Sequence, residues 1–155
     1  MKAPASINPR IVEALYCDAL VLADEVRARF DETRRAGLEA ELGDDARVAV
    51  SCEGLRTTTR VMHCLAWLLN HRAFFEGEIS EMQLRRHGRL IGNLPASSAE
   101  EIAALPPAMG RLVTESERLY ARIVRLERAW RARDAMLVPV NAIERLRERL
   151  GASLR

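Results

Sequence analysis

Apolar side chains recur at steps of three and four residues along three long stretches of the chain, and this spacing predicts three amphipathic helices. The first is expected over residues 8–35, because Asn8-Pro9 combines an N-cap residue with proline at the first helical position. The second is expected over residues 45–76, and the third begins after Pro107 and continues to about Trp130. No segment alternates apolar and polar residues for long enough to predict a strand.

A three-helix bundle is the simplest arrangement in which three helices with one apolar stripe each can bury all three stripes. We therefore predict an all-α protein, with an antiparallel three-helix bundle over residues 1–131 and a long loop before its third helix. That loop, residues 88–107, is rich in Gly, Pro and Ser. Short helical stretches are expected at Ser80–His87 and Ser98–Leu105.

Residues 132–155 are predicted to form a flexible tail, because Pro139 interrupts the helical pattern. The segment that follows this proline, Asn141–Leu150, is amphipathic but too short to be a stable helix by itself. Its apolar side is formed by Ile143, Leu146 and Leu150. We expect this tail to fold when it binds a partner.

The predicted central helix has apolar side chains on two sides. When successive residues are placed about 100° apart, one side is interpreted as the core face, formed by Leu55, Thr58, Met62, Leu65, Ala66, Leu69 and Ala73 with Val61 and Leu68 at its margin. The opposite side carries a second set, Arg56, Arg60, His63, Trp67, Asn70 and Phe74. A helix with two apolar sides needs a second partner. That partner is the 88–107 loop, the same helix of a second copy, or a different protein.

The predicted third helix carries a basic stripe opposite its apolar side, formed by Arg111, Arg118, Arg122 and Arg125. Residues 111–155 contain 11 arginines against 6 acidic residues, so the last third of the chain is basic. Such a stripe contacts nucleic-acid phosphates or an acidic protein, or it is an ordinary solvated face. We favour the solvated face, because glutamates flank the stripe and no aromatic residues are interleaved for base stacking.

Composition and charge restrict the alternatives further. The 155 residues carry a net charge of +2, which is too small by itself to indicate a nucleic-acid partner. No stretch reaches the roughly 20 apolar residues of a membrane span, and MKAPASINPR has no apolar segment of a signal peptide. The three cysteines are an odd number at irregular spacing. We therefore expect a cytoplasmic protein with free thiols and no membrane partner.

The residues that carry chemistry form no recognisable catalytic or metal-binding motif. His63, Cys64 and His71 lie near one another in the sequence but lack C-x-x-C or H-x-x-x-H spacing. The sequence contains neither G-x-S-x-G nor a glycine-rich phosphate loop. We therefore predict a protein that is not an enzyme and that binds no metal or cofactor.

The stretch Leu55–Glu78, LRTTTRVMHCLAWLLNHRAFFEGE, resembles the signature segment of DUF1465, an alphaproteobacterial family of unknown function that includes the regulator of CtrA degradation. The matching elements are Thr58–Arg60, Met62, Trp67–Leu69, Arg72 and Glu76–Glu78. The resemblance implies a homodimeric three-helix bundle without enzymatic activity. It also implies an adaptor role, because the family's characterised member helps the ClpXP protease degrade cell-cycle regulators and has a flexible C-terminal tail.

Two functional hypotheses remain. The first is a non-enzymatic protein–protein adaptor that forms a homodimer and whose partners, by resemblance, are ClpXP, its response-regulator-type adaptor or client proteins. Its physical motive is the second apolar side of the central helix. The alternative is a nucleic-acid-binding helical module that uses the Arg111–Arg125 stripe, and it predicts binding that weakens as the salt concentration rises.

Overall fold

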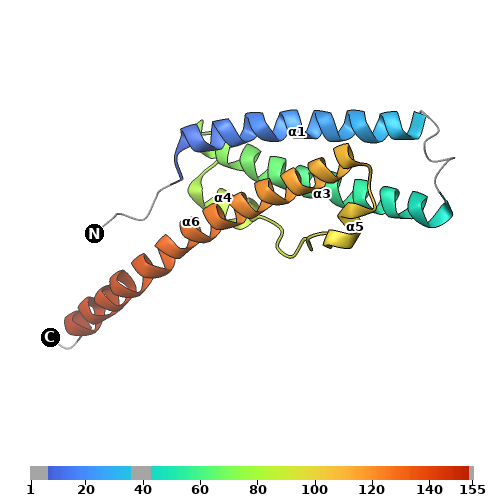
Figure 1. The fold of residues 1–155 in the computed structure, drawn as a ribbon. Helices are drawn as coiled ribbons and strands as arrows, with labels where there is room; N and C mark the ends of the chain where they lie inside the picture. The colour runs from blue at the N-terminus through green and yellow to red at the C-terminus, as the bar shows by residue number, and fades with distance from the viewer. Residues whose placement is uncertain (1–6, 36–42, 154–155) are drawn as a thin grey trace.

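The computed structural model describes the backbone of residues 7–35 and 43–153, and within these ranges all side chains except those of residues 34, 134–146 and 148–153. Every regular element in these ranges is a helix, which confirms the all-α class. Three long helices, α1 (Pro9–Arg35), α3 (Asp44–Phe75) and α6 (Pro107–Ser153), pack together. Two short helices, α4 (Glu81–His87) and α5 (Ala99–Ala103), lie on the connection between α3 and α6 (Figure 1).

Capping residues explain where several helices begin. The side-chain oxygen Oδ1 of Asn8 accepts a hydrogen bond of 2.8 Å from the amide of Arg10, so Asn8 caps α1 as predicted. Ser80 and Ser98 each form a capping box at the start of α4 and α5, respectively. These local signals confirm the predicted start of α1 and the two short helices before α6.

α1 and α3 pack side by side in opposite directions. Arg72, near the end of α3, forms an ion pair with Glu13, near the start of α1, with 2.8 Å between nitrogen and oxygen. At the other end, Gly54 lies against Phe30, and a Cβ at Gly54 would lie 2.9 Å from two carbons of the ring. Gly54 therefore permits a close approach of α1 to α3 and does not interrupt the helix.

α3 and α6 run in the same direction, so the predicted antiparallel bundle is only partly correct. Val50, near the start of α3, clusters with Met109 near the start of α6. Further along both helices, the rings of His71 and Trp130 lie 5.3 Å apart. The connection between α3 and α6 returns along the bundle before α6 begins (Figure 1). A connection of this length lets α6 follow α3 in parallel, and both helices are antiparallel to α1.

α6 continues through Pro139 to Ser153, so the helix end predicted near Trp130, ahead of that proline, is wrong. Proline removes one intrahelical hydrogen bond, and a helix that extends several turns on both sides of it tolerates this loss. The backbone of residues 132–153 therefore prolongs the third helix away from the bundle (Figure 1). The apolar tail side chains predicted above, Ile143, Leu146 and Leu150, lie outside the described residues.

The main core lies between the three long helices and is mostly aliphatic. α3 contributes Val61, Cys64, Leu65, Trp67 and Leu68 to it. Most of the face of α3 that was predicted to be its core side is instead exposed, including Leu55, Met62 and Leu69. The prediction is wrong because the spacing of apolar residues shows that a helix has two apolar sides, but not which side the bundle covers.

Candidate protein-docking surface

Trp67 is covered by its own chain. Its indole is 2% exposed and stacks on the imidazole of His71, with ring centroids 3.7 Å apart. His71 in turn contacts Trp130 of α6, and Leu90 of the returning connection belongs to the same core cluster. Of the three partners considered for the Trp67 side, the structure shows the 88–107 connection, together with α6, so the hypothesis that this side docks a second protein is wrong.

Arg60, also predicted to lie on the partner face, is buried and 1% exposed. Its guanidinium donates hydrogen bonds to Ser116 Oγ on α6 at 2.8 Å and to the carbonyl oxygen of Pro95 at 3.1 Å. The carboxylate of Glu117 lies 3.6 Å away. Because a buried charge is costly unless it is paired, these contacts hold the returning connection between α3 and α6.

Arg56 joins α3 to α5 through the carboxylate of Glu101 and also pairs with Glu53 of its own helix. Its guanidinium lies 2.6 Å from Glu53 and 3.1 Å from Glu101, and the hydrogen bond with Glu101 is the main cause that raises the pKa of Arg56. The hydrogen bond from the backbone amide of Ser98 is the main cause that lowers the pKa of Glu101, and the hydrogen bond from Arg56 is the next largest cause. The remaining residues of the predicted face are partly exposed, namely His63, Asn70 and Phe74.

The outward side of α3 carries an apolar stripe with the spacing of a coiled coil. Val48, Leu55, Met62 and Leu69 lie seven residues apart, and their exposed fractions are 62%, 71%, 57% and 47%. Four positions after each of these large residues lies a smaller one; the smaller residues are Cys52, Thr59, Ala66 and Ala73. Alternating steps of four and three residues place all eight on one line along the helix. We call these eight residues the heptad stripe.

A groove of about 490 Å³ between α1 and α3 lies beside the heptad stripe. Leu20 of α1 and Met62 of α3 both line it, and Leu20 is itself exposed. Asp24 and Arg27 also line the groove and form an ion pair with 3.1 Å between nitrogen and oxygen. The apolar surface of α3 therefore extends onto α1 and has charged residues beside it.

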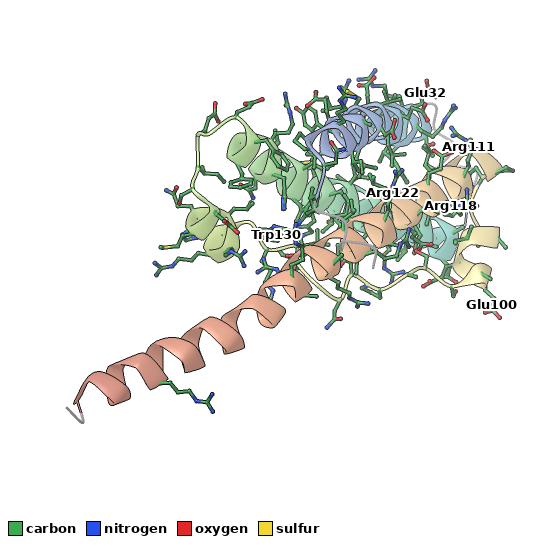
Figure 2. All side chains as sticks on the ribbon, turned by 90° about the vertical axis from the view of Figure 1, so that its left-hand side faces the viewer. Glu32, Glu100, Arg111, Arg118, Arg122 and Trp130 are labelled. Carbon is green, nitrogen blue, oxygen red and sulfur yellow. The ribbon has the colours of Figure 1, made fainter. Side chains whose placement is uncertain are left out.

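The predicted basic stripe is exposed along α6, where Figure 2 shows Arg111, Arg118 and Arg122. Arg111 pairs with Glu25 of α1 at 3.1 Å and with Glu115 at 2.8 Å, and the hydrogen bond with Glu25 is the main cause that raises its pKa. No ion pair joins Arg118, Arg122 or Arg125 to another residue in the described part of the chain. Among the described residues, the stripe therefore contains three arginines without an ion pair and one that is tied to α1.

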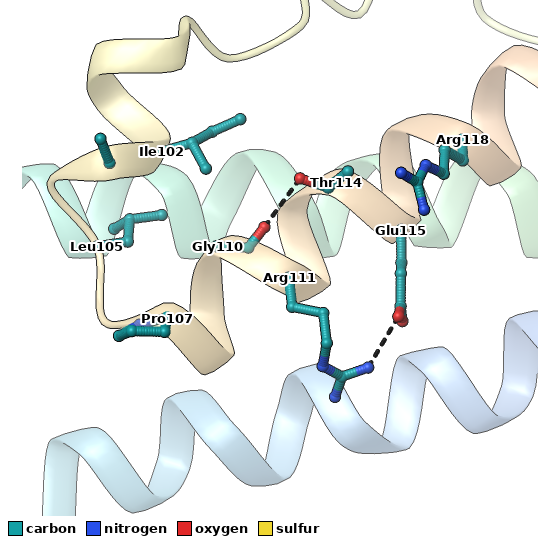
Figure 3. A pocket seen from close by; sticks show the side chains of 9 residues that line it. Ile102, Leu105, Pro107, Gly110, Arg111, Thr114, Glu115 and Arg118 are labelled. Atoms are coloured by element: carbon teal, nitrogen blue, oxygen red, sulfur yellow. Dashed lines mark hydrogen bonds and ion pairs between the residues drawn. The ribbon is translucent and has the colours of Figure 1, made fainter.

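A smaller pocket of about 400 Å³ lies between α5 and the first turns of α6 (Figure 3). Apolar residues such as Ile102 and Leu105 form part of its lining, and the Arg111–Glu115 ion pair forms another part. The hydroxyl of Thr114 donates to the Gly110 carbonyl oxygen at 3.1 Å. Among the residues that line this pocket, none forms the nucleophile–base pair that covalent catalysis requires.

The buried thiol and imidazole on α3 are both neutral. Burial raises the pKa of Cys64 to about 12, so its thiol stays protonated and unreactive. Burial also lowers the pKa of His71, whose Nδ1–H donates to the Trp67 carbonyl oxygen at 3.0 Å. Among the described residues, no group of three or more His, Cys, Asp or Glu could hold a metal ion. None of the described helices combines the length and the apolar character that a membrane crossing needs.

The chain is thus a helical bundle whose unusual surface feature is an uncovered coiled-coil stripe. The sequence profile described as "Protein of unknown function (DUF1465)" matches residues 3–154. The chain therefore belongs to the DUF1465 family, which confirms the family indicated by the central helix. No curated protein and no solved structure matches the chain.

Proposed function

We propose that this protein is a non-enzymatic adaptor that acts as a homodimer and brings other proteins together. The observation that carries the proposal is the heptad stripe, which lies on a helix whose other side is already buried. Regularly spaced large apolar side chains in contact with water are typical of a helix–helix interface. A second copy of α3 is the partner with the matching spacing.

The heptad stripe is complementary to itself in the antiparallel direction. Consider two α3 helices related by a two-fold axis between Thr59 and Met62. Each large side chain then faces a small one, in the pairs Val48–Ala73, Leu55–Ala66, Met62–Thr59 and Leu69–Cys52. A two-fold dimer requires this kind of self-complementary surface. In a parallel pair, Leu55 would face Leu55 and Ala66 would face Ala66. Layers with two large side chains would then alternate with layers with two small ones, and the interface would pack poorly.

The adaptor role rests on a sequence resemblance, because the DUF1465 family is itself described only as a protein of unknown function. The segment Leu55–Glu78 resembles the regulator of CtrA degradation, and that protein helps ClpXP degrade cell-cycle regulators. We therefore propose ClpXP, its response-regulator-type adaptor and their client proteins as the partners, in the cytoplasm. The protein would supply surfaces for docking, and the protease would supply the chemistry.

Size-exclusion chromatography with light scattering tests the dimer. The wild type is expected to have the mass of two chains, and the double variant Leu55→Glu/Met62→Glu that of one, because four charges would meet in a dry interface. Met82→Glu is a matched control, since Met82 is exposed on α4 and lies outside the heptad stripe. A wild type that is monomeric at tens of micromolar would contradict the proposal.

Reconstituted proteolysis tests the adaptor role. Purified ClpXP should degrade a fluorescent cell-cycle regulator from the same organism faster when the wild-type protein is present. The Leu55→Glu/Met62→Glu variant should accelerate degradation less, and Met82→Glu should act like the wild type. If the wild type leaves the degradation rate unchanged, that regulator is not a client and the proposed adaptor role fails for it.

Nucleic-acid binding is the alternative function. It is favoured by three arginines that form no ion pair with a described residue, namely Arg118, Arg122 and Arg125. The ion pairs of Arg111 count against it, because they tie one end of the stripe to α1. Charge reversal at Arg118 and Arg122 should weaken binding to duplex DNA at low salt if this role exists. The absence of any gel shift with duplex DNA would remove it.

A further inference from the structure

We propose that a cleft between residues 89–94 and α6 binds an acidic, extended peptide segment of a partner protein. The cleft has a volume of about 880 Å³, which is within the usual range of protein ligand sites. One wall is the chain at 89–94, and the other includes Tyr120, Val124 and Arg128 of α6. This inference deepens the proposed adaptor role and rests on it, because it gives a client protein a docking site separate from the heptad stripe.

Hydrogen bonds from α6 hold the loop wall of the cleft in place. Both carboxylate oxygens of Glu127 accept from the amide of Leu90, at 3.0 and 3.1 Å. The hydroxyl of Tyr120 donates to the carbonyl oxygen of Ile91 at 2.7 Å. Asn93 has a φ of 65° and turns the chain within this wall. A wall that is fixed before binding loses little conformational entropy when a ligand arrives.

The two chain segments that border the cleft are strongly basic. Residues 81–94 and 120–133 together contain eight arginines and two glutamates. Both carboxylates are already engaged, since Glu81 pairs with Arg85 and Glu127 pairs with Arg131 at 2.7 Å. An acidic ligand would therefore meet no competing free carboxylate from these two segments.

Two arginines of the cleft are available to a ligand. Arg89 lies on the loop wall and Arg128 on α6, and both are exposed. Neither forms an ion pair with any residue that the structure describes. Guanidinium groups bind carboxylates through charge-assisted hydrogen bonds, so a pair on opposite walls favours a ligand with several carboxylates.

The remaining features favour a peptide over a nucleic acid. Ile91 is 54% exposed in the loop wall and offers an apolar contact beside the cations. The indole of Trp130 nearby is contacted by the guanidinium groups of Arg85 and Arg131, at 5.0 and 5.4 Å from the ring centroid. This ring is therefore already engaged by the protein's own cations, whereas nucleic-acid strands need free aromatic faces for base stacking.

Fluorescence anisotropy on the full-length protein tests the cleft, with a short fluorescein-labelled peptide of alternating Glu and Leu as the probe. The variant Arg89→Glu/Arg128→Glu should raise the Kd about tenfold or more. Arg10→Glu/Arg35→Glu makes the same change in net charge at two exposed arginines of α1, and it should bind like the wild type. Ile91→Ser should weaken binding of the Glu/Leu peptide but not of a Glu/Ser peptide.

Several outcomes would overturn the proposal. One is a wild type that shows no saturable binding, and another is an equal loss of affinity in the cleft and control variants. Tighter binding of single-stranded DNA, lost in the same cleft variant, would assign the cleft to nucleic acid instead. Light scattering distinguishes a failure of the peptide-binding proposal from a failure of the proposed homodimer. A wild type that is dimeric but does not bind the peptide contradicts only the proposed peptide site. A wild type that is monomeric but binds the peptide contradicts only the proposed homodimer.

Discussion

The indole of Trp67 and the imidazole of His71 stack one helical turn apart on α3, with their ring centroids 3.7 Å apart. Both rings are buried, and Trp130 of α6 lies against the imidazole. The side of α3 that carries Trp67 is therefore interior, and the surface available to a partner is the opposite side, where Leu55 is exposed.

Replacing Trp67 with alanine is expected to destabilise the fold by about 3–5 kcal/mol, because a large buried ring would leave a cavity between α3 and α6. Urea unfolding followed by circular dichroism measures this change. Phe75→Ala is the control, since Phe75 is more than one-third exposed and should cost about 1 kcal/mol or less. Equal effects of the two substitutions would show that Trp67 is not the core residue described.

Replacing Arg60 with methionine is expected to destabilise the fold by about 1–3 kcal/mol, because its buried partners would lose their donor. Arg125→Met, at an exposed position without an ion pair to a described residue, should change the free energy of unfolding by no more than about 0.5 kcal/mol. Amide hydrogen exchange adds a local measurement. Exchange at Ala96 and Ser97 should become faster in the Arg60 variant, and unchanged exchange there would contradict a role in holding the connection.

Stability should fall with decreasing pH through the titration of His71. Burial lowers the pKa of this imidazole in the folded state, so the unfolded state takes up a proton first. The free energy of unfolding is therefore expected to decrease most clearly as the pH falls through and below about 6.5, and the contribution of His71 fades as the pH rises above that value. Urea titrations between about pH 7.5 and about pH 5.5 measure how the free energy of unfolding of the wild type and of His71→Leu changes with pH. If the free energy of unfolding of His71→Leu has the same dependence on pH as that of the wild type, His71 is not the cause of that dependence.

Local features of the fold could be predicted from the sequence because they depend on neighbouring residues. Asn8-Pro9 predicts the start of α1, and Ser80 and Ser98 predict the two short helices through capping that spans only three residues. Pro139 was misleading for a physical reason. One proline removes a single hydrogen bond, and the helix continues on both sides of it.

The inward side of α3 could not be predicted from spacing alone. The Trp67 side carries Arg60 and other polar residues, which is typical of a surface, and their buried partners come from residues distant in the sequence. The direction of α6 likewise depends on how the connection after α3 returns along the bundle. Both features are tertiary, and a pattern within one helix contains no information about them.

The candidate docking surface is visible in the sequence as an apolar side of the central helix, and spacing alone predicts that this side belongs to the core. Leu55, Met62 and Leu69 form one apolar side of the predicted helix, and their seven-residue spacing is the spacing of a coiled coil. A helix buried in its own bundle usually shows a wider apolar face than such a narrow line. The regular spacing, extended to Val48, is the signal that could have identified the stripe as an interface.

The central claim is that two heptad stripes pair in the antiparallel direction, and disulfide formation across the pair tests it most directly. In a Cys17→Ser background, Leu69→Cys places a thiol where the pairing predicts Cys52 of the second copy. Mild oxidation should convert this variant to a covalent dimer on a non-reducing gel. The Cys17→Ser protein alone should remain a single chain, because antiparallel pairing separates the two Cys52 residues by roughly 25 Å. A covalent dimer of Cys17→Ser alone, or none with Leu69→Cys, would contradict the account.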